Sequence, residues 1–171
     1  MSNWYMLTLV GRDRPGIVAA VTGVLYEAGL NLGEASMMRL GGNFTIMLMA
    51  GGETSETALG DLLAPTARDL GLRVHVDAIE GALHQHRIPN FRVRVLGADR
   101  AGIVAQVTRA LAGAGFNILE LESDVAGTEQ VPVYIMNIEG YAETALEALQ
   151  AALEAVGEVD ATVEPVETLV G

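Results

Sequence analysis

The sequence has no cysteine, no lysine and no long apolar run. Without cysteine the chain cannot form disulfides, transfer metals through CxxC motifs or use thiol catalysis. No apolar run is long enough to span a membrane, and the N-terminal residues have neither the basic region nor the apolar region of a signal peptide. These absences predict a cytoplasmic protein with no membrane association.

Positive charge is also scarce in the sequence. All ten basic residues are arginines, against 22 acidic residues, and the formal net charge is −12. Binding to nucleic acid depends largely on cationic contacts with phosphate, so this charge opposes direct DNA or RNA binding. RNA recognition on a sheet would also need exposed aromatic residues, and aromatics are 5% of the sequence. Half of the residues are hydrophobic, which is typical of a globular chain.

The strongest positive feature is an internal repeat. The segment GRDRPGIV at 11–18 returns as GADRAGIV at 97–104, and AGLN at 28–31 returns as AGFN at 114–117. A long period that occurs only twice indicates two copies of one small domain rather than a solenoid. We therefore predict a first domain at 1–80, a polar linker at 81–89 and a second domain at 90–171.

Hydrophobic periodicity predicts the same order of elements in both copies. The first copy is expected to form strands at 4–10, 30–40, 43–50 and 72–76, with helices at 15–28 and 55–70. The second copy is expected to have helices at 101–114 and 142–156 between its strands. Pro15 is expected in the first turn of its helix, and Asp13 is placed to cap that helix or to favour its positive end. The predicted fold class is α+β, with two tandem ferredoxin-like βαββαβ domains.

One face of the first sheet poses a question, because helices cover only one side of a βαββαβ sheet. Phe44, Ile46 and Leu48 alternate with Met47 and Met49, so both faces of this strand are apolar. An apolar second face implies that the two sheets cover each other or that another subunit covers them. The methionines could equally be ordinary core residues, and the sequence leaves both readings open.

The turn before the first helix of each copy is the candidate ligand site. A helix N-terminus presents unpaired amides with a partial positive charge, which can hold a carboxylate. Gly16 and Gly102 have no Cβ, so a ligand could approach the backbone closely. Asn31 and Asn117 follow the helices and offer both donors and acceptors. These groups suit a small zwitterion, although the same residue types also serve as ordinary turn and capping residues.

The turn, the helix, AGLNL at 28–32 and the paired strands resemble the ACT domain, over nearly the whole chain. The two-copy layout, EAS at 34–36 and GGNFTIM at 41–47 resemble the glycine cleavage system transcriptional repressor family. This resemblance implies a regulator that senses a small amino acid, often at the interface between ACT units. It further implies a homo-oligomer that acts through a LysR-type transcription factor, with glycine as the effector.

The resemblance also assigns ligand binding to the matching positions of both copies. They are Asp13, Arg14, Pro15, Gly16, Ile17 and Asn31 in the first copy, and Asp99, Arg100, Gly102, Ile103 and Asn117 in the second. Ala101 stands where the first copy has Pro15, so the second turn loses a fixed φ and its site is less well supported.

The remaining motifs do not predict an enzyme. P-loop, GxSxG, HExxH and dinucleotide-binding patterns are absent from the sequence. Glu120, Glu122 and Asp124 share one sheet face without a nucleophile or histidine, which favours a solvated face. His84 and His86 have no ligand set to complete a metal site. We therefore predict no catalytic residue, cofactor or metal; the alternatives are an acylphosphatase-like hydrolase or an ACT protein with another regulatory role.

Two arginines complete the candidate residues. Arg92 and Arg94 alternate along one strand and so share one sheet face. They are expected to pair with Glu120, Glu122 or Asp124 across the sheet or at a subunit contact.

Overall fold

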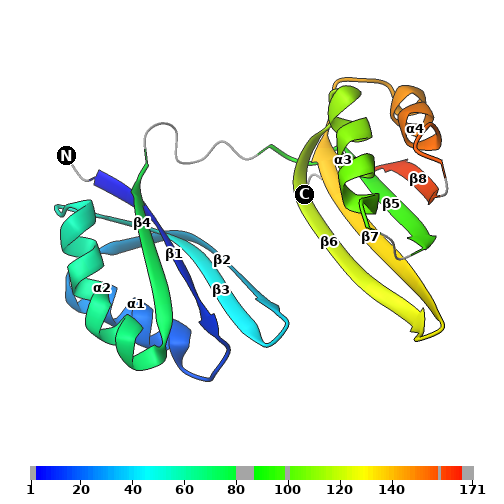
Figure 1. Cartoon of the computed structure of the whole chain (residues 1–171). Helices are drawn as coiled ribbons and strands as arrows, with labels where there is room; N and C mark the ends of the chain where they lie inside the picture. The colour runs from blue at the N-terminus through cyan, green and yellow to red at the C-terminus, as the bar shows by residue number, and fades with distance from the viewer. Residues whose placement is uncertain (1–2, 80–86, 99–100, 158, 167–171) are drawn as a thin grey trace. The chain divides into compact units, whose positions relative to one another are not determined.

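The computed structural model describes residues 3–79, 87–98, 101–157 and 159–166. The chain divides into two compact units, Met1–His84 and Gln85–Gly171 (Figure 1). Most of the expected linker lies outside the described residues, so its bounds stay a prediction.

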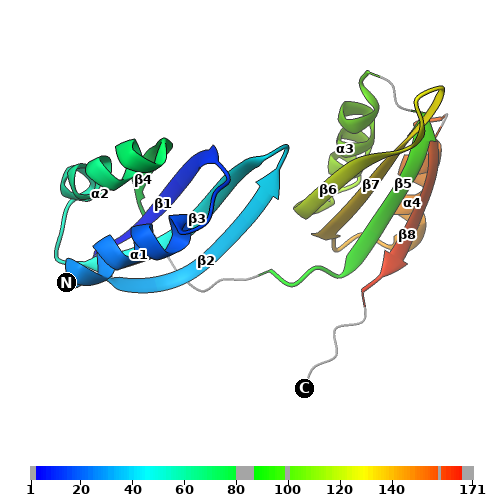
Figure 2. The same ribbon diagram turned by 90° about the horizontal axis from the view of Figure 1, so that it is seen from below.

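The first unit has the predicted βαββαβ order. Its elements are β1 (Asn3–Arg12), α1 (Ile17–Glu27), β2 (Asn31–Leu40), β3 (Asn43–Gly52), α2 (Glu56–Leu70) and β4 (Leu72–Ala78). The antiparallel sheet has the strand order β2-β3-β1-β4. Both helices pack on the same face of this sheet (Figure 2).

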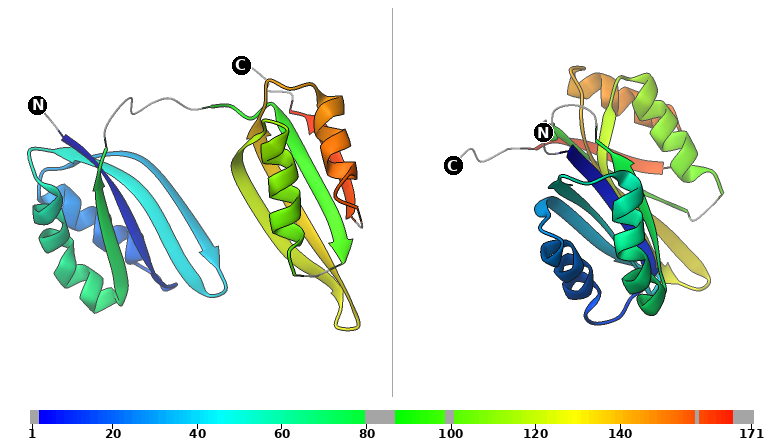
Figure 3. Two further views of the ribbon diagram at one scale, coloured as in Figure 1. Left: turned by 45° about the horizontal axis from the view of Figure 1, so that its top comes forward. Right: turned by 90° about the vertical axis from the view of Figure 1, so that its left-hand side faces the viewer.

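The second unit repeats this topology. Its elements are β5 (Phe91–Ala98), α3 (Ile103–Gly113), β6 (Asn117–Thr128), β7 (Val131–Tyr141), α4 (Leu146–Glu154) and β8 (Val159–Pro165). The sheet order β6-β7-β5-β8 corresponds strand for strand to that of the first unit, and the helices again share one face (Figure 3). The predicted fold class, two ferredoxin-like units in tandem, is confirmed.

Each unit has its own hydrophobic core between the sheet and the helices. In β1 the side chains of Leu7 and Leu9 are fully buried on the helix face, and Val93 and Val95 do the same in β5. The intervening residues point to the opposite face, as the period of a strand requires. The alternation therefore fixes which residues of each strand remain outside the core.

Helices α1 and α3 begin later than predicted. Gly16 is the N-cap of α1 with φ 89°, and Gly102 is the N-cap of α3 with φ 90°. A left-handed residue interrupts the helical backbone, so Pro15 lies in the turn and not in the first turn of the helix. Among the described residues no side chain caps either helix start, and the expected capping role of Asp13 is not observed.

Helix α4 also begins later than predicted, at Leu146 instead of residue 142. Asn90 accounts for this difference. Its side-chain amide donates to the carbonyl of Ala142 at 2.7 Å, and its Oδ1 accepts from the Ala142 amide at 3.0 Å. These two bonds tie the backbone of Ala142 to Asn90, the residue before β5, and the helix starts four residues later.

Candidate ligand site

The turn between β1 and α1 is tied to the hairpin between β2 and β3. The Asp13 amide donates to the carbonyl of Gly42 at 3.1 Å, and the Asp13 carboxylate pairs with Arg39 Nε at 2.6 Å. The hairpin and the turn border an open depression of about 460 Å³, lined by Arg12, Asp13, Gly41, Gly42 and Asn43. Sequence reasoning missed Arg39, because only the register of β2 against β3 brings it to the turn.

Arg14 has a structural partner in this turn. Its Nη2 donates to the Asp69 carbonyl at 2.7 Å. Asp69 lies in the last turn of α2, where carbonyl groups have no intrahelical donor and a cation is favourable. The guanidinium of Arg14 therefore stabilises the end of α2, and a ligand at the turn would have to share it.

The backbone at the start of α1 is open to approach. A Cβ at Gly16 would meet no described atom within 4 Å. The Ala20 amide donates to the Gly16 carbonyl at 2.9 Å, so the amides of residues 17–19 lie ahead of this first helical hydrogen bond. The Ile17 side chain is buried in the core and anchors the helix start. The arrangement leaves backbone donors at the positive end of a helix, where a carboxylate is favoured.

The second unit reproduces this backbone arrangement. A Cβ at Gly102 would likewise meet no described atom within 4 Å, and the Gln106 amide donates to the Gly102 carbonyl at 2.9 Å. Ile103 is buried as Ile17 is. Asp99 and Arg100, the other predicted residues of this turn, lie outside the described residues.

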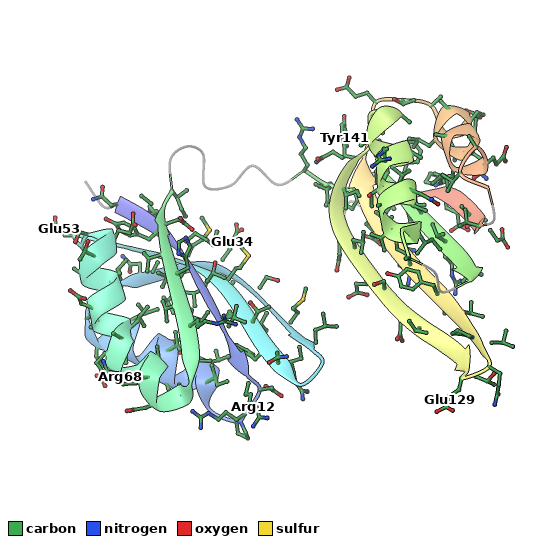
Figure 4. The ribbon with its side chains drawn as sticks, in the orientation of Figure 1. Arg12, Glu34, Glu53, Arg68, Glu129 and Tyr141 are labelled. Carbon is green, nitrogen blue, oxygen red and sulfur yellow. The ribbon has the colours of Figure 1, made fainter. Side chains whose placement is uncertain are left out.

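The structure separates the predicted asparagines from the turns. Asn31 is in register with Gly51 at one end of the first sheet, whereas the turn follows Arg12, which pairs with Asn43 at the other end. A strand of 10 residues such as β2 is roughly 33 Å long. In Figure 4, the labelled Arg12 and Glu53 mark these two ends. Within one unit the turn and the asparagine therefore lie at opposite ends of the sheet, and ligand binding by Asn31 stays a prediction.

Asn117 has the same position in the second unit. It opens β6 in register with Tyr141, away from the turn that precedes α3. It borders an open depression that is formed by α3 and the start of β6, and the other lining residues are Ala105, Thr108, Arg109, Ala112, Phe116 and Ile118. The asparagine and the turn of this unit are therefore also separated along the sheet.

The face of the second sheet opposite the helices is charged. Glu120, Glu122 and Asp124 share this face, as predicted, and Arg92 Nε donates to Glu139 Oε1 at 2.8 Å across the sheet. The charged side chains surround a depression of about 470 Å³, lined by Arg92, Arg94, Glu120, Glu122, Asn137, Glu139, Thr162 and Glu164. Arg92 pairs across the sheet as expected, but its partner Glu139 is not one of the three predicted acidic residues.

Two further sequence features carry no site in the described part of the chain. His84 and His86 lie outside the described residues, and the remainder holds no group of three or more histidine, aspartate or glutamate side chains able to bind a metal. Within the same residues, no helix combines the length and apolar character needed to cross a membrane.

Comparison with known proteins agrees with this architecture. ACT domain sequence profiles match residues 5–77 and 91–157. The chain belongs to the ACT-domain family. Each matched segment falls within one βαββαβ unit, so the protein carries two ACT domains in tandem.

Individual relatives narrow the relationship. A UPF0237 protein of Lactococcus lactis is 36% identical over 83 residues, 47% of this chain and 95% of that protein. The glycine cleavage system transcriptional repressor of Escherichia coli is 26% identical over 153 residues, 89% of this chain and 80% of the repressor. The structure of an unknown protein from Galdieria sulphuraria has a TM-score of 0.76 at 24% identity, covering 98% of this chain and 100% of that one. The chain is an ACT-domain regulatory protein related to the glycine cleavage repressor.

Proposed function

We propose that this protein is a cytoplasmic, non-enzymatic sensor that binds a small amino acid at the turns before α1 and α3. The observation that carries the proposal is the repeated helix start. Gly16 and Gly102 have the same left-handed backbone and the same open approach to uncapped amides. The relation to a transcriptional repressor supports a regulatory use of such a site, with glycine as the first candidate ligand.

The first turn offers the fuller set of polar groups. A zwitterion could place its carboxylate on the α1 amides and its ammonium on the Asp13 carboxylate, in competition with Arg39. One helix end contributes about 0.3–1 kcal/mol, and millimolar affinity needs about 4 kcal/mol, so several contacts must act together. In the second unit Val125 occupies the register position of Arg39, which makes the first turn the stronger site. Asn31 of a second copy would complete it.

We further propose that the signal passes through a protein partner, a transcription factor of the LysR type. With a net charge of −12 the chain itself is unsuited to DNA. The ligand would act by stabilising one conformation of the protein over another. It can shift that equilibrium only by the difference between its affinities for the two conformations.

Calorimetric titration of the full chain with glycine and a panel of other amino acids tests the ligand. We expect saturable binding of at least one small amino acid, weakened about tenfold by Gly16→Ala, a loss of about 1.4 kcal/mol. Gly29→Ala is the matched control. Gly29 lies just beyond the other end of α1, has a positive φ and faces open space, as Gly16 does. Gly29→Ala therefore adds similar backbone strain at a position away from the turn.

Two outcomes would overturn the ligand proposal. One is the absence of binding by every amino acid of the panel; the other is equal weakening by Gly16→Ala and Gly29→Ala. Turnover of an acyl phosphate by the purified chain would favour the hydrolase alternative.

Affinity capture from cell extract, with and without the amino acid that binds, tests the partner. We expect the protein to retain a transcription factor and a specific amino acid to change the retained amount. Recovery of the protein alone under every condition would contradict this part of the proposal. A specific DNA shift by the isolated protein at physiological salt would contradict the argument from charge.

A further inference from the structure

The face of the first sheet opposite its helices carries Trp4 and four methionines among small polar residues. We name it the methionine face; it comprises Trp4, Met6, Thr8 and Val10 of β1, Ser36 and Met38 of β2, and Thr45, Met47 and Met49 of β3. The alternate residues of the same strands, including Leu7 and Leu48, are buried in the core. Met38 is 57% exposed and Met47 is 49% exposed. Yellow sulfur atoms mark part of this face in Figure 4.

Several of these positions are polar in the second unit, although Leu96 and Ile135 stand in the places of Val10 and Thr45. Arg92 and Arg94 follow the pairing of Met6 and Thr8 on the central strand, and Asn137 stands in the place of Met47. A chain that solvates this face in one ACT domain has no structural need of methionine there in the other. An exposed apolar patch of this kind marks an interaction surface, and methionine suits surfaces that repack against a partner.

The charged side chains along β4 indicate which molecule covers the methionine face. Arg73, His75 and Asp77 lie on the methionine-face side of β4, in register with Val10, Thr8 and Met6. A two-fold axis that runs across the strands lays β4 of one copy over β4 of a second copy with its direction reversed. Arg73 of each copy then faces Asp77 of the other, and Asp77 also contacts His75 Nε2 of its own chain at 3.1 Å. Arg73 thereby gains an acidic partner across the axis.

The other two-fold arrangement lacks this complementarity. An axis along the strands lays β4 over β2 of the second copy. This axis keeps each residue in its own row of the sheet. Arg73 therefore faces Met38, and His75 faces Ser36. The charged face of the second unit is also a poor occupant, because its acidic side chains would lose water against methionine without gaining partners.

We propose that the methionine face is the interface between two copies of this chain, packed sheet to sheet about a two-fold axis across the strands. Met47 and Thr8 lie in the central row, next to their own counterparts, with the sheets about 10 Å apart. Four strands about 4.8 Å apart and about 23 Å long give roughly 450 Å² per copy. A standard interface has about 800 Å² per partner, so the dimer forms and dissociates with concentration. This inference is independent of the amino-acid site.

Sedimentation velocity of the full chain over a range of concentrations tests the interface. We expect a monomer–dimer equilibrium that Met47→Glu weakens by at least about tenfold, since it buries a charge against its own counterpart. Asn137→Glu is the matched control, because it places the same charge at the equivalent position of the second sheet, and the equilibrium should not change. The only tryptophan of the sequence, Trp4, lies on the methionine face, so its emission should shift to the blue as the dimer forms.

Exchanging the charges of Arg73 and Asp77 on β4 tests the direction of the two-fold axis. Arg73→Asp and Asp77→Arg should each weaken the dimer several-fold, because each places like charges opposite one another. The double variant R73D/D77R restores opposite charges across the axis and should recover the wild-type equilibrium. A wild-type chain that stays monomeric at every concentration overturns the proposal. So does equal weakening by Met47→Glu and Asn137→Glu, or a double variant no better than the single ones.

Discussion

Met6 and Arg92 occupy equivalent places on the central strands of the two sheets, both on the face opposite the helices. On the neighbouring strand, Met49 and Glu139 stand beside them in the same register. The core side of these strands did not diverge in this way, since Leu7 and Val93 are both fully buried. The comparison indicates that the core-facing residues specify this fold. The residues on the opposite face can be apolar in one unit and charged in the other without a change of fold.

The two cores also solve one packing problem differently. Phe116 takes the place that Leu30 has in the first unit, and the larger ring needs space. A Cβ at Gly140 would lie 2.4 Å from Phe116 Cε1, whereas the first unit has Ala50 at that position. In the first unit the space is made at Gly52 instead, where a Cβ would lie 2.4 Å from Leu30 Cδ2.

The largest expected effect is the loss of unfolding free energy when a buried leucine is removed from either core. Leu25 and Leu111 are equivalent helix residues with 0% exposure, so Leu25→Ala and Leu111→Ala should each cost about 2–5 kcal/mol of unfolding free energy. Each should act on its own unit, because each core is closed within one unit. Urea titration followed by Trp4 fluorescence reports on the first unit, and circular dichroism reports on both. Equal displacement of the Trp4 transition by both variants would show that the units unfold together; Tyr26→Ala, at an exposed position, is the control.

A smaller effect is expected where the two cores differ. Gly140→Ala should destabilise the second unit by about 1–3 kcal/mol, because the added methyl group meets Phe116 and the Asn117 carbonyl, each at 2.4 Å. Adding Phe116→Leu, which copies the first unit, should recover part of the loss. The Asn117 carbonyl remains in the way, so recovery should be incomplete. An unfolding free energy unchanged by Gly140→Ala would contradict this packing.

Much of the fold could be predicted from the sequence because local and repeated signals agreed. The alternation in β1 and the helical period after Ile17 are local properties, and each was present twice. The start of α1 could not be predicted as easily, because Pro15 is well suited to a first helical turn. The left-handed backbone at Gly16 delays the start of α1 to Ile17. Because glycine adopts positive and negative φ with similar ease, its φ cannot be predicted from the sequence.

The candidate site was predicted only in part. Its backbone donors follow from the glycine before each helix, which the repeat makes visible. The partners of the charged side chains depend on distant segments, since Arg14 reaches Asp69 and Asp13 reaches Arg39. The position of Asn31 was open to prediction: a helix that returns along the sheet must place the next strand's start at the far end.

The smallest expected effect concerns the charged face of the second unit. Glu139→Gln removes the acidic partner of Arg92, whose side chain is 53% exposed while that of Glu139 is 28% exposed. Such a pair contributes about 0.2–1 kcal/mol, and salt screens it, so the loss of unfolding free energy should shrink between low and high ionic strength. Met49→Gln, at the equivalent position of the first sheet, should instead perturb a residue that is 7% exposed and cost more. A larger loss of unfolding free energy for Glu139→Gln than for Met49→Gln would mean that the ion pair on the charged face stabilises the second unit. The charges on this face would then contribute to the fold and would not be neutral replacements for methionine.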